Sequence, residues 1–221
     1  AYRPDSSNQL PIAVPAAGAD APVNAGPMAI NAAGTRLFVA STTTSAVARY
    51  AIATSGANAG ALSADGSPLG AAVAGLIGIN DMVLAGNGRD LYVHAGSGAA
   101  GRIGYLKSEA SGMSVGLIPV LDATGTGLLG NPLSLALSPD GEHLIGVNKG
   151  SDAMFSVRRN PVSGGLAVDG AGVLQFQDVL RRTAVPGAIE ARGLDMAAAV
   201  AVTHDNRHVI VASGSGTGTV G

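Results

Sequence analysis

The chain contains no cysteine and no tryptophan, and only 13% of its residues are charged. Without cysteine, disulfides and thiolate metal sites are excluded. Four tyrosines and three phenylalanines offer few stacking surfaces for bases or sugars, and a net charge of −2 argues against nucleic-acid binding. No apolar run is long enough to span a bilayer. We therefore expect neither a nucleic-acid partner nor a membrane-spanning segment.

The residues that are abundant suit a folded domain with many turns. The 221 residues are 47% hydrophobic and include 33 glycines. A chain of this length can bury roughly 70% of its unfolded surface, which is enough for a core. Avoidance of cysteine fits an exported bacterial protein, so we expect an extracellular or periplasmic location. Ala1-Tyr2-Arg3 does not start a charged-then-apolar leader, so any leader would have been removed or would lie outside this sequence.

Residues 135–147, with the sequence LALSPDGEHLIGV, have the pattern of a strand, a turn and a second strand. Apolar side chains alternate before the turn, which is the period of a pleated strand. Asp140-Gly141 predicts a two-residue type I′ turn, in which both residues have positive φ. Leu144 and Ile145 are adjacent apolar residues after the turn, so both faces of the second strand are expected to be covered.

The same unit recurs three more times along the chain. The second residue of each turn serves as an anchor, and the four anchors are Gly34, Gly88, Gly141 and Asn206. Their spacings are 54, 53 and 65 residues, which indicates a repeat architecture. In the first three copies a third strand is expected to begin twelve residues after the anchor, at 46–52, 100–106 and 153–159. A fourth strand is expected at 116–121 and 174–180, and is weak at 61–70.

Four antiparallel strands per unit predict an all-β fold built as a β-propeller of four-stranded antiparallel blades. A β-sandwich is the alternative, but it has no reason to repeat one pattern every ~54 residues. The expected units are 28–70, 80–122, 133–182 and an incomplete 198–221, with loop insertions at 167–173 and 183–192. Segment 8–15 is in the register of an outer strand of a preceding or closing blade. Because uncovered edges are a liability, we expect further residues of the same polypeptide, or a protein partner, to complete the arc.

The hairpin at 137–145 resembles the SPDG hairpin of lactonase-like, YVTN-type propeller repeats. The resemblance continues through one unit in Phe155-Ser156, Ser163-Gly164, 174–180, 193–194 and 200–213. Ala32-Ala33 and His204-Asp205-Asn206 depart from it, since they replace the Pro-Asp-Gly turn. The resemblance implies a propeller, which occurs in enzymes and in non-enzymatic surface proteins alike. The catalytic residues of the lactonases map onto no position of this chain.

Asp81, His94 and Arg102 are the candidates for catalysis. His94 lies in an otherwise apolar strand, where a buried polar group needs a partner. It is either a satisfied core histidine or a ligand-binding residue. Arg102 takes the place that apolar residues hold in two other units, and we expect it to pair with a carboxylate such as Asp81.

A second set of polar residues falls in the loops that join strand two to strand three, and strand four to the next unit. Such loops cluster on one face of a propeller, so these residues are candidates for ligand binding: Asn80, Asp81, Asn131, Asn148, Lys149, Asp152 and Asp195. The alternative is that their side chains bond their own backbone in turns. They contain no acidic calcium loop, and we expect no metal and no cofactor.

The histidines near the turns are not expected to bind zinc. His143 and His208 lie two residues after their anchors, a position that holds Arg36 and Asp90 in the other units. We interpret this position as an exposed strand start. His204 and His208 are four residues apart, but a turn separates them and no third ligand is evident.

These patterns favour a non-enzymatic binding or structural module. The alternative is a lactonase-like hydrolase acting on a small lactone. An enzyme should place several charged side chains with shifted pKa values at the mouth of the central channel, whereas a scaffold should place small residues there. A WD-type hub is disfavoured because the Trp-Asp signature is absent.

Overall fold

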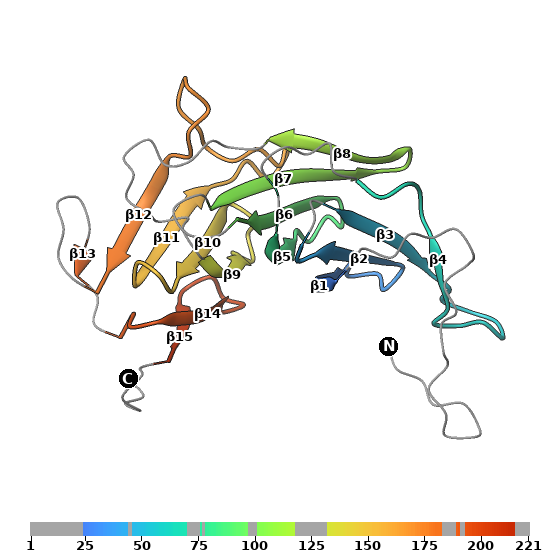
Figure 1. The fold of residues 1–221 in the computed structure, drawn as a ribbon, viewed down its shortest axis with the longest axis horizontal. Coiled ribbons are helices and arrows are strands. Elements are labelled where there is room, and N and C mark those ends of the chain that lie inside the picture. The colour runs from blue at the N-terminus through green and yellow to red at the C-terminus, as the bar shows by residue number, and fades with distance from the viewer. Residues whose placement is uncertain are drawn as a thin grey trace.

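The fold is all-β. The computed structural model describes residues 24–43, 46–69, 76, 78–96, 101–117, 132–182, 189–190 and 193–214. Every regular element in these ranges is a strand, and the strands form four sheets that follow one another along an open arc (Figure 1). Within the same ranges, no helix is long and apolar enough to cross a membrane. The predicted fold class is confirmed, and no closure between the first and last sheets is seen among these strands.

The sheets use the strands in the order of the chain. The first sheet contains β1 (Ala25–Ile30), β2 (Arg36–Ser41), β3 (Val47–Ile52) and β4 (Leu62–Ala64). The second contains β5 (Ile79–Leu84), β6 (Asp90–Ala95), β7 (Arg102–Glu109) and β8 (Gly112–Leu117). The third contains β9 (Pro132–Leu137), β10 (His143–Asn148), β11 (Ala153–Arg158), β12 (Phe176–Arg181) and β13 (Ile189–Glu190). The fourth contains β14 (Ala197–Val202) and β15 (Val209–Ser213).

Neighbouring strands pair antiparallel, apart from β13, which runs parallel to β12. The expected loop at 183–192 is therefore wrong at Ile189 and Glu190, which add a fifth strand. The fourth strand of the second unit begins at Gly112 and not at Gly116, because β7 runs on to Glu109 and pairs there with Gly112 across a tight turn. The fourth strand of the first unit is short, as predicted. The predicted outer strand at 8–15 lies outside the described residues.

The hairpin turns are not of the predicted two-residue type. The anchors Gly34, Gly88, Gly141 and Asn206 have φ values of 66°, 66°, 71° and 59°. Asp140, the residue before the third anchor, is not among the residues with positive φ, so the turn is not type I′. Instead, Gly141 donates its N–H to the Ser138 carbonyl at 2.8 Å, and the Ser138 N–H reaches the His143 carbonyl at 3.0 Å. This is a longer loop built around a four-residue turn.

Side chains within the turn stabilise this longer loop. Asp140 Oδ1 accepts the N–H of Glu142 at 2.9 Å and the hydroxyl of Ser138 at 2.5 Å. The Ser138 hydroxyl, the Glu142 N–H and Asn206 together lower the pKa of Asp140. The last turn repeats the arrangement, since Asp205 accepts the hydroxyl of Thr203. The departure from Pro-Asp-Gly in the last unit therefore leaves the turn intact.

The apolar core lies between consecutive sheets. The junction of the first and second sheets contains Phe38, Ala40, Val47, Leu91, Val93 and Leu106. The junction of the second and third sheets contains Tyr92, Ile103, Leu135, Leu144, Phe155 and Val157. Leu144 and Ile145 are both buried on opposite faces of β10, so the prediction that both faces of this strand are covered is confirmed.

Candidate functional site

The first strand of each sheet forms the inner edge of the arc. These strands, β1, β5, β9 and β14, are in contact one after another and lie on its concave side (Figure 1). In a propeller this edge surrounds the axis. The residues at the start of β5, β9 and β14 therefore occupy one end of the axis, where the sequence placed its candidate rim.

Asp81 joins two of these inner strands. Its Oδ1 accepts the N–H of Met82 at 2.8 Å, and its Oδ2 accepts the N–H of Leu135 on β9 at 2.5 Å. The side chain is half-buried. Burial raises the pKa of Asp81, although the two backbone hydrogen bonds and one from Ser134 oppose the shift. A carboxylate whose pKa is raised can exchange a proton closer to neutral pH than an ordinary aspartate can.

The same position ties the next pair of sheets together. Ser134 lies seven residues before Gly141, as Asp81 lies seven residues before Gly88. Its hydroxyl accepts the N–H of Val200 on β14 at 3.3 Å. A side-chain oxygen at this repeat position thus holds the backbone of the following inner strand. Alignment of the units could have revealed this acceptor, which the sequence analysis missed.

Of the other catalytic candidates, His94 lies close to Asp81 and Arg102 does not. Asp81 and His94 are directly paired across β5 and β6, so their side chains share the face toward the third sheet. His94 is fully buried there. Arg102 is paired with Ala95, whose side chain points to the opposite face because successive residues of a strand alternate. The predicted Arg102–Asp81 pair is therefore wrong, and no ion pair of Arg102 occurs among the described residues.

Asp152 and Asp195 are brought together by an arginine that the sequence analysis did not single out. Arg182 Nη1 lies 3.0 Å from Asp195 Oδ1 and 3.7 Å from Asp152 Oδ2. Asp152 Oδ1 also accepts the N–H of Met196 at 2.9 Å. Asp152 and Met196 both have positive φ, at 46° and 51°, which is uncommon for residues with side chains. These contacts fix the loop that leads into β14.

The remaining rim candidates make local contacts or are exposed. Asn80 donates its amide to the Gly96 carbonyl at 2.8 Å. Asn148 is buried, and its side-chain oxygen accepts the N–H groups of Gly150 and Ser151, as the turn alternative predicts. Lys149 is exposed, and Asn131 lies outside the described residues.

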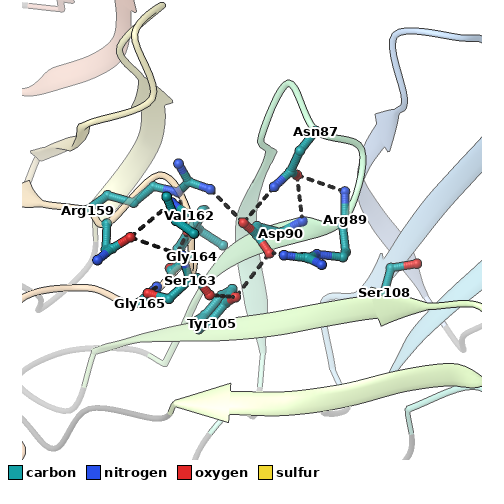
Figure 2. A network of polar contacts seen from close by, with 12 residues as sticks. Asn87, Arg89, Asp90, Tyr105, Ser108, Arg159, Val162, Ser163, Gly164 and Gly165 are labelled. Carbon is teal, nitrogen blue, oxygen red and sulfur yellow. Dashed lines mark hydrogen bonds and ion pairs between the residues drawn. The ribbon is translucent and has the colours of Figure 1, made fainter.

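A buried polar network lies where the second and third sheets meet, near the hairpin turns (Figure 2). Arg159 Nη2 lies 2.6 Å from Asp90 Oδ2, and Arg159 Nε donates to the Tyr92 hydroxyl at 2.5 Å. Tyr105 donates to Asp90 Oδ1 at 3.0 Å. The interpretation of this repeat position as an exposed strand start holds for His208 but is wrong for Asp90, because Arg159 of the next sheet covers and neutralises the carboxylate.

The network raises the pKa values of two tyrosines and leaves room only for glycine in a nearby loop. Burial raises the pKa of Tyr92 to about 12. The pKa of Tyr105 is also raised, mainly by burial and next by the hydrogen bond to the Asp90 carboxylate and its charge. Tyr92 donates to the Gly164 carbonyl at 2.5 Å. Gly164 has φ of +78°, and a Cβ there would collide with the Tyr105 hydroxyl. Glycine is therefore required where this loop closes over the network.

A groove of about 300 Å³ lies between the third and fourth sheets, away from the rim. Its polar lining comes from Ser138, His143, Ser156, Asp178, Asn206, Arg207 and His208, and its apolar lining from Ile145, Met154, Leu180, Val202 and Val209. The two histidines that the sequence aligned thus lie along one groove. Across the ranges that the structure describes, no group of three His, Asp or Glu residues is arranged to hold a metal ion.

Comparison with known proteins supports the fold and leaves the family open. No protein-family model matches the chain, and no curated protein matches it. Among solved structures, it is similar to a Bacteroides uniformis protein provisionally described as a 6-phosphogluconolactonase, with a TM-score of 0.59, 16% identity, and coverage of 86% of this chain and 47% of that one. It is also similar to a Desulfotomaculum acetoxidans protein of unknown function, with a TM-score of 0.61, 17% identity, and coverage of 87% of this chain and 52% of that one. For the periplasmic gluconolactonase of Pseudomonas aeruginosa the TM-score is 0.50 and the identity 20%, and the alignment covers 69% of this chain and 40% of that one.

At these identities the likeness shows the fold alone. The chain spans about half the length of these solved structures. Two of the three carry lactonase descriptions, and the likeness supports the propeller fold expected from the SPDG hairpin. The YVTN-type repeat itself stays a prediction.

Proposed function

We propose that this chain belongs to a lactonase-like hydrolase that opens a small lactone at the axial end of β5 and β9. The observation that carries the proposal is Asp81, a half-buried carboxylate with a raised pKa on an innermost strand. The gluconolactonase descriptions of two structural neighbours supply the substrate class. Because the chain spans about half of those neighbours, the proposal concerns the activity of the assembled propeller.

The reaction needs a base and a proton donor. Water adds to the lactone carbonyl while the Asp81 carboxylate accepts its proton, and the ring C–O bond then breaks. The ring oxygen then takes up the proton that Asp81 accepted from water, so that the carboxylate is regenerated and the product is an open-chain hydroxy acid. The N–H groups of Met82 and Leu135 fix the Asp81 carboxylate, which keeps its remaining lone pairs in a constant direction.

The test is acid release from glucono-δ-lactone by the assembled propeller that contains this chain, measured as the rate in excess of the buffer reaction. We expect saturable hydrolysis that Asp81→Asn abolishes. Asp178→Asn is the control, because this exposed carboxylate bonds Ser156 on β11, away from the inner strands. Hydrolysis that is absent in the wild type, or equal in both variants, would contradict the proposal.

A second candidate function is the non-enzymatic binding module that the sequence favoured. The observation for it is that Asp152 and Asp195, both at the candidate rim, form ion pairs with Arg182. On this account the rim is a rigid scaffold that binds a protein partner. It predicts a folded chain without lactone turnover. The periplasmic location of the Pseudomonas aeruginosa neighbour supports an exported location under either proposal.

A further inference from the structure

One repeat position supplies side-chain acceptors to the inner strands. It lies seven residues before each anchor, and in the four sheets it holds Pro27, Asp81, Ser134 and Ala199. Asp81 accepts the N–H of Leu135 in the following sheet. Ser134 likewise accepts the N–H of Val200 in the sheet after that. Pro27 carries no acceptor, and the other oxygen of Asp81 accepts the N–H of Met82 at 2.8 Å. Asp81 thus serves two inner strands, whereas Ser134 serves one.

The Ser134 hydroxyl has one proton, which it donates to Asp81. Burial raises the pKa of Asp81, and the hydrogen bond from Ser134 to the carboxylate opposes that rise. The same hydroxyl oxygen accepts the Val200 N–H at 3.3 Å. A hydroxyl that accepts one hydrogen bond is polarised by it and donates a stronger one. The three groups therefore form a chain of hydrogen bonds from β14 through β9 to β5.

The titratable residues that face Asp81 come from one strand. His94 of β6 lies directly opposite it. Tyr92 and Asp90 follow on the same face of β6 toward the turn, where they belong to the buried polar network. The described strands β1, β9 and β14 carry no titratable side chain, and Arg36 at the turn end of β2 is paired with a carboxylate of its own sheet. From the side of the third and fourth sheets, the polar side chain that acts on Asp81 is therefore Ser134.

We infer that Ser134 is a positioning residue for Asp81, through which the packing of the fourth sheet on the third acts on the proposed base. While Val200 donates to Ser134, the hydroxyl proton is directed at Asp81 and the carboxylate is favoured over the acid. Without that donor the hydroxyl is free to turn, and the carboxylate loses part of its stabilisation. The catalytic meaning of this link rests on the proposed function, but its effect on Asp81 is measurable without turnover.

The titration of Asp81 tests the inference. Its carboxyl carbon is followed by NMR from pH 3.5 to pH 7 in the assembled propeller, and the signal is identified by its loss in Asp81→Asn. We expect Ser134→Ala to move the midpoint to higher pH, because the carboxylate loses a donor, and Ser134→Thr to restore it. Ser156→Ala is the matched control, since Ser156 donates to Asp178 at 3.2 Å, away from the inner strands, and should leave the midpoint unchanged.

Val200→Pro tests the link to the fourth sheet. The Val200 N–H points at Ser134 and away from β15, so proline removes this donor without removing a hydrogen bond between β14 and β15. We expect the Asp81 midpoint to move in the same direction as in Ser134→Ala. Val200→Ala keeps the N–H and is expected to leave the midpoint in place.

The pH–rate profile of lactone hydrolysis should move with the midpoint in each variant. A midpoint that Ser134→Ala leaves unchanged overturns the inference, even where the variant loses stability. A midpoint that moves in Ser134→Ala and stays in place in Val200→Pro overturns it too, because the fourth sheet would then have no influence on Asp81. A midpoint that moves in both, with no matching change in hydrolysis, supports the inference and contradicts the proposed hydrolase.

Discussion

Arg159 and Asp90 form a buried ion pair between two sheets, with Arg159 Nη2 2.6 Å from Asp90 Oδ2. Arg159 follows β11 in the third sheet, and Asp90 begins β6 in the second. Arg159 also donates hydrogen bonds to the Tyr92 hydroxyl and, at 2.7 Å, to the Gly141 carbonyl. A pair of this kind is destabilising when one partner is removed, because the other charge stays buried without compensation.

Arg159→Met is therefore expected to lower the free energy of unfolding by about 3–5 kcal/mol. The double variant Asp90→Asn with Arg159→Met should lose less than Arg159→Met alone, because no charge is then left buried. Arg182→Met is the control, since its exposed ion pairs should contribute at most about 1 kcal/mol. Urea melts decide it, and a double variant less stable than the single would contradict the account.

Leu144→Ala tests the packing between the second and third sheets. Leu144 is fully buried, so the change should cost about 2–5 kcal/mol through lost burial and a residual cavity. Val162→Ala, at an exposed position, should have little effect. A loss below ~1 kcal/mol for Leu144→Ala in urea would mean that β10 is not held between two sheets.

Asp81 should reduce stability as the pH rises. Burial raises its pKa in the folded state above the ordinary 3.8, so its favourable contribution is complete below 3.8 and is lost as the pH rises through the folded-state pKa. Asp81→Asn removes this loss. We therefore compare the difference in melting temperature, wild type minus Asp81→Asn, at two pH values. We expect this difference to be larger at pH 3.5 than at pH 7. The opposite trend would show that hydrogen bonds to the carboxylate outweigh its burial.

Tyr92 should make the protein sensitive to alkali. Its pKa is raised from 10.0 to about 12, so the stability it contributes is complete below pH 10 and is lost as the pH rises toward 12. The wild type should therefore lose melting temperature more steeply than Tyr92→Phe between pH 10 and 11. Parallel slopes would contradict the burial of the Tyr92 hydroxyl.

The repeat made most of the fold predictable, because the anchors and the alternation around them are local patterns. Gly141 and its equivalents all have positive φ, as expected of the second turn residue. The turn type was missed because the Ser138 and Asp140 side chains favour a longer loop, a choice that the Asp-Gly pair alone does not reveal. Local patterns thus located the turns without defining their length.

The polar contacts between sheets were less predictable. Asp90 and Arg159 are 69 residues apart, and nothing local to either residue indicates the other. Arg182 was overlooked for the same reason. The predicted pairing of Arg102 with Asp81 failed because the strand register places Ala95, and not His94, opposite Arg102. The roles of the rim residues in binding or catalysis stay predictions.

The pH dependence of lactone hydrolysis tests the central claim most directly, because it reports the protonation state of the proposed base. Initial rates with glucono-δ-lactone would be measured from pH 3.5 to pH 7, corrected for the buffer reaction, for the wild type and Asp81→Asn. We predict that the wild-type rate rises with pH as Asp81 ionises, at a pKa above 3.8, and that Asp81→Asn shows no such rise. Identical profiles for the two proteins, or no hydrolysis above the buffer rate in either, would contradict the account.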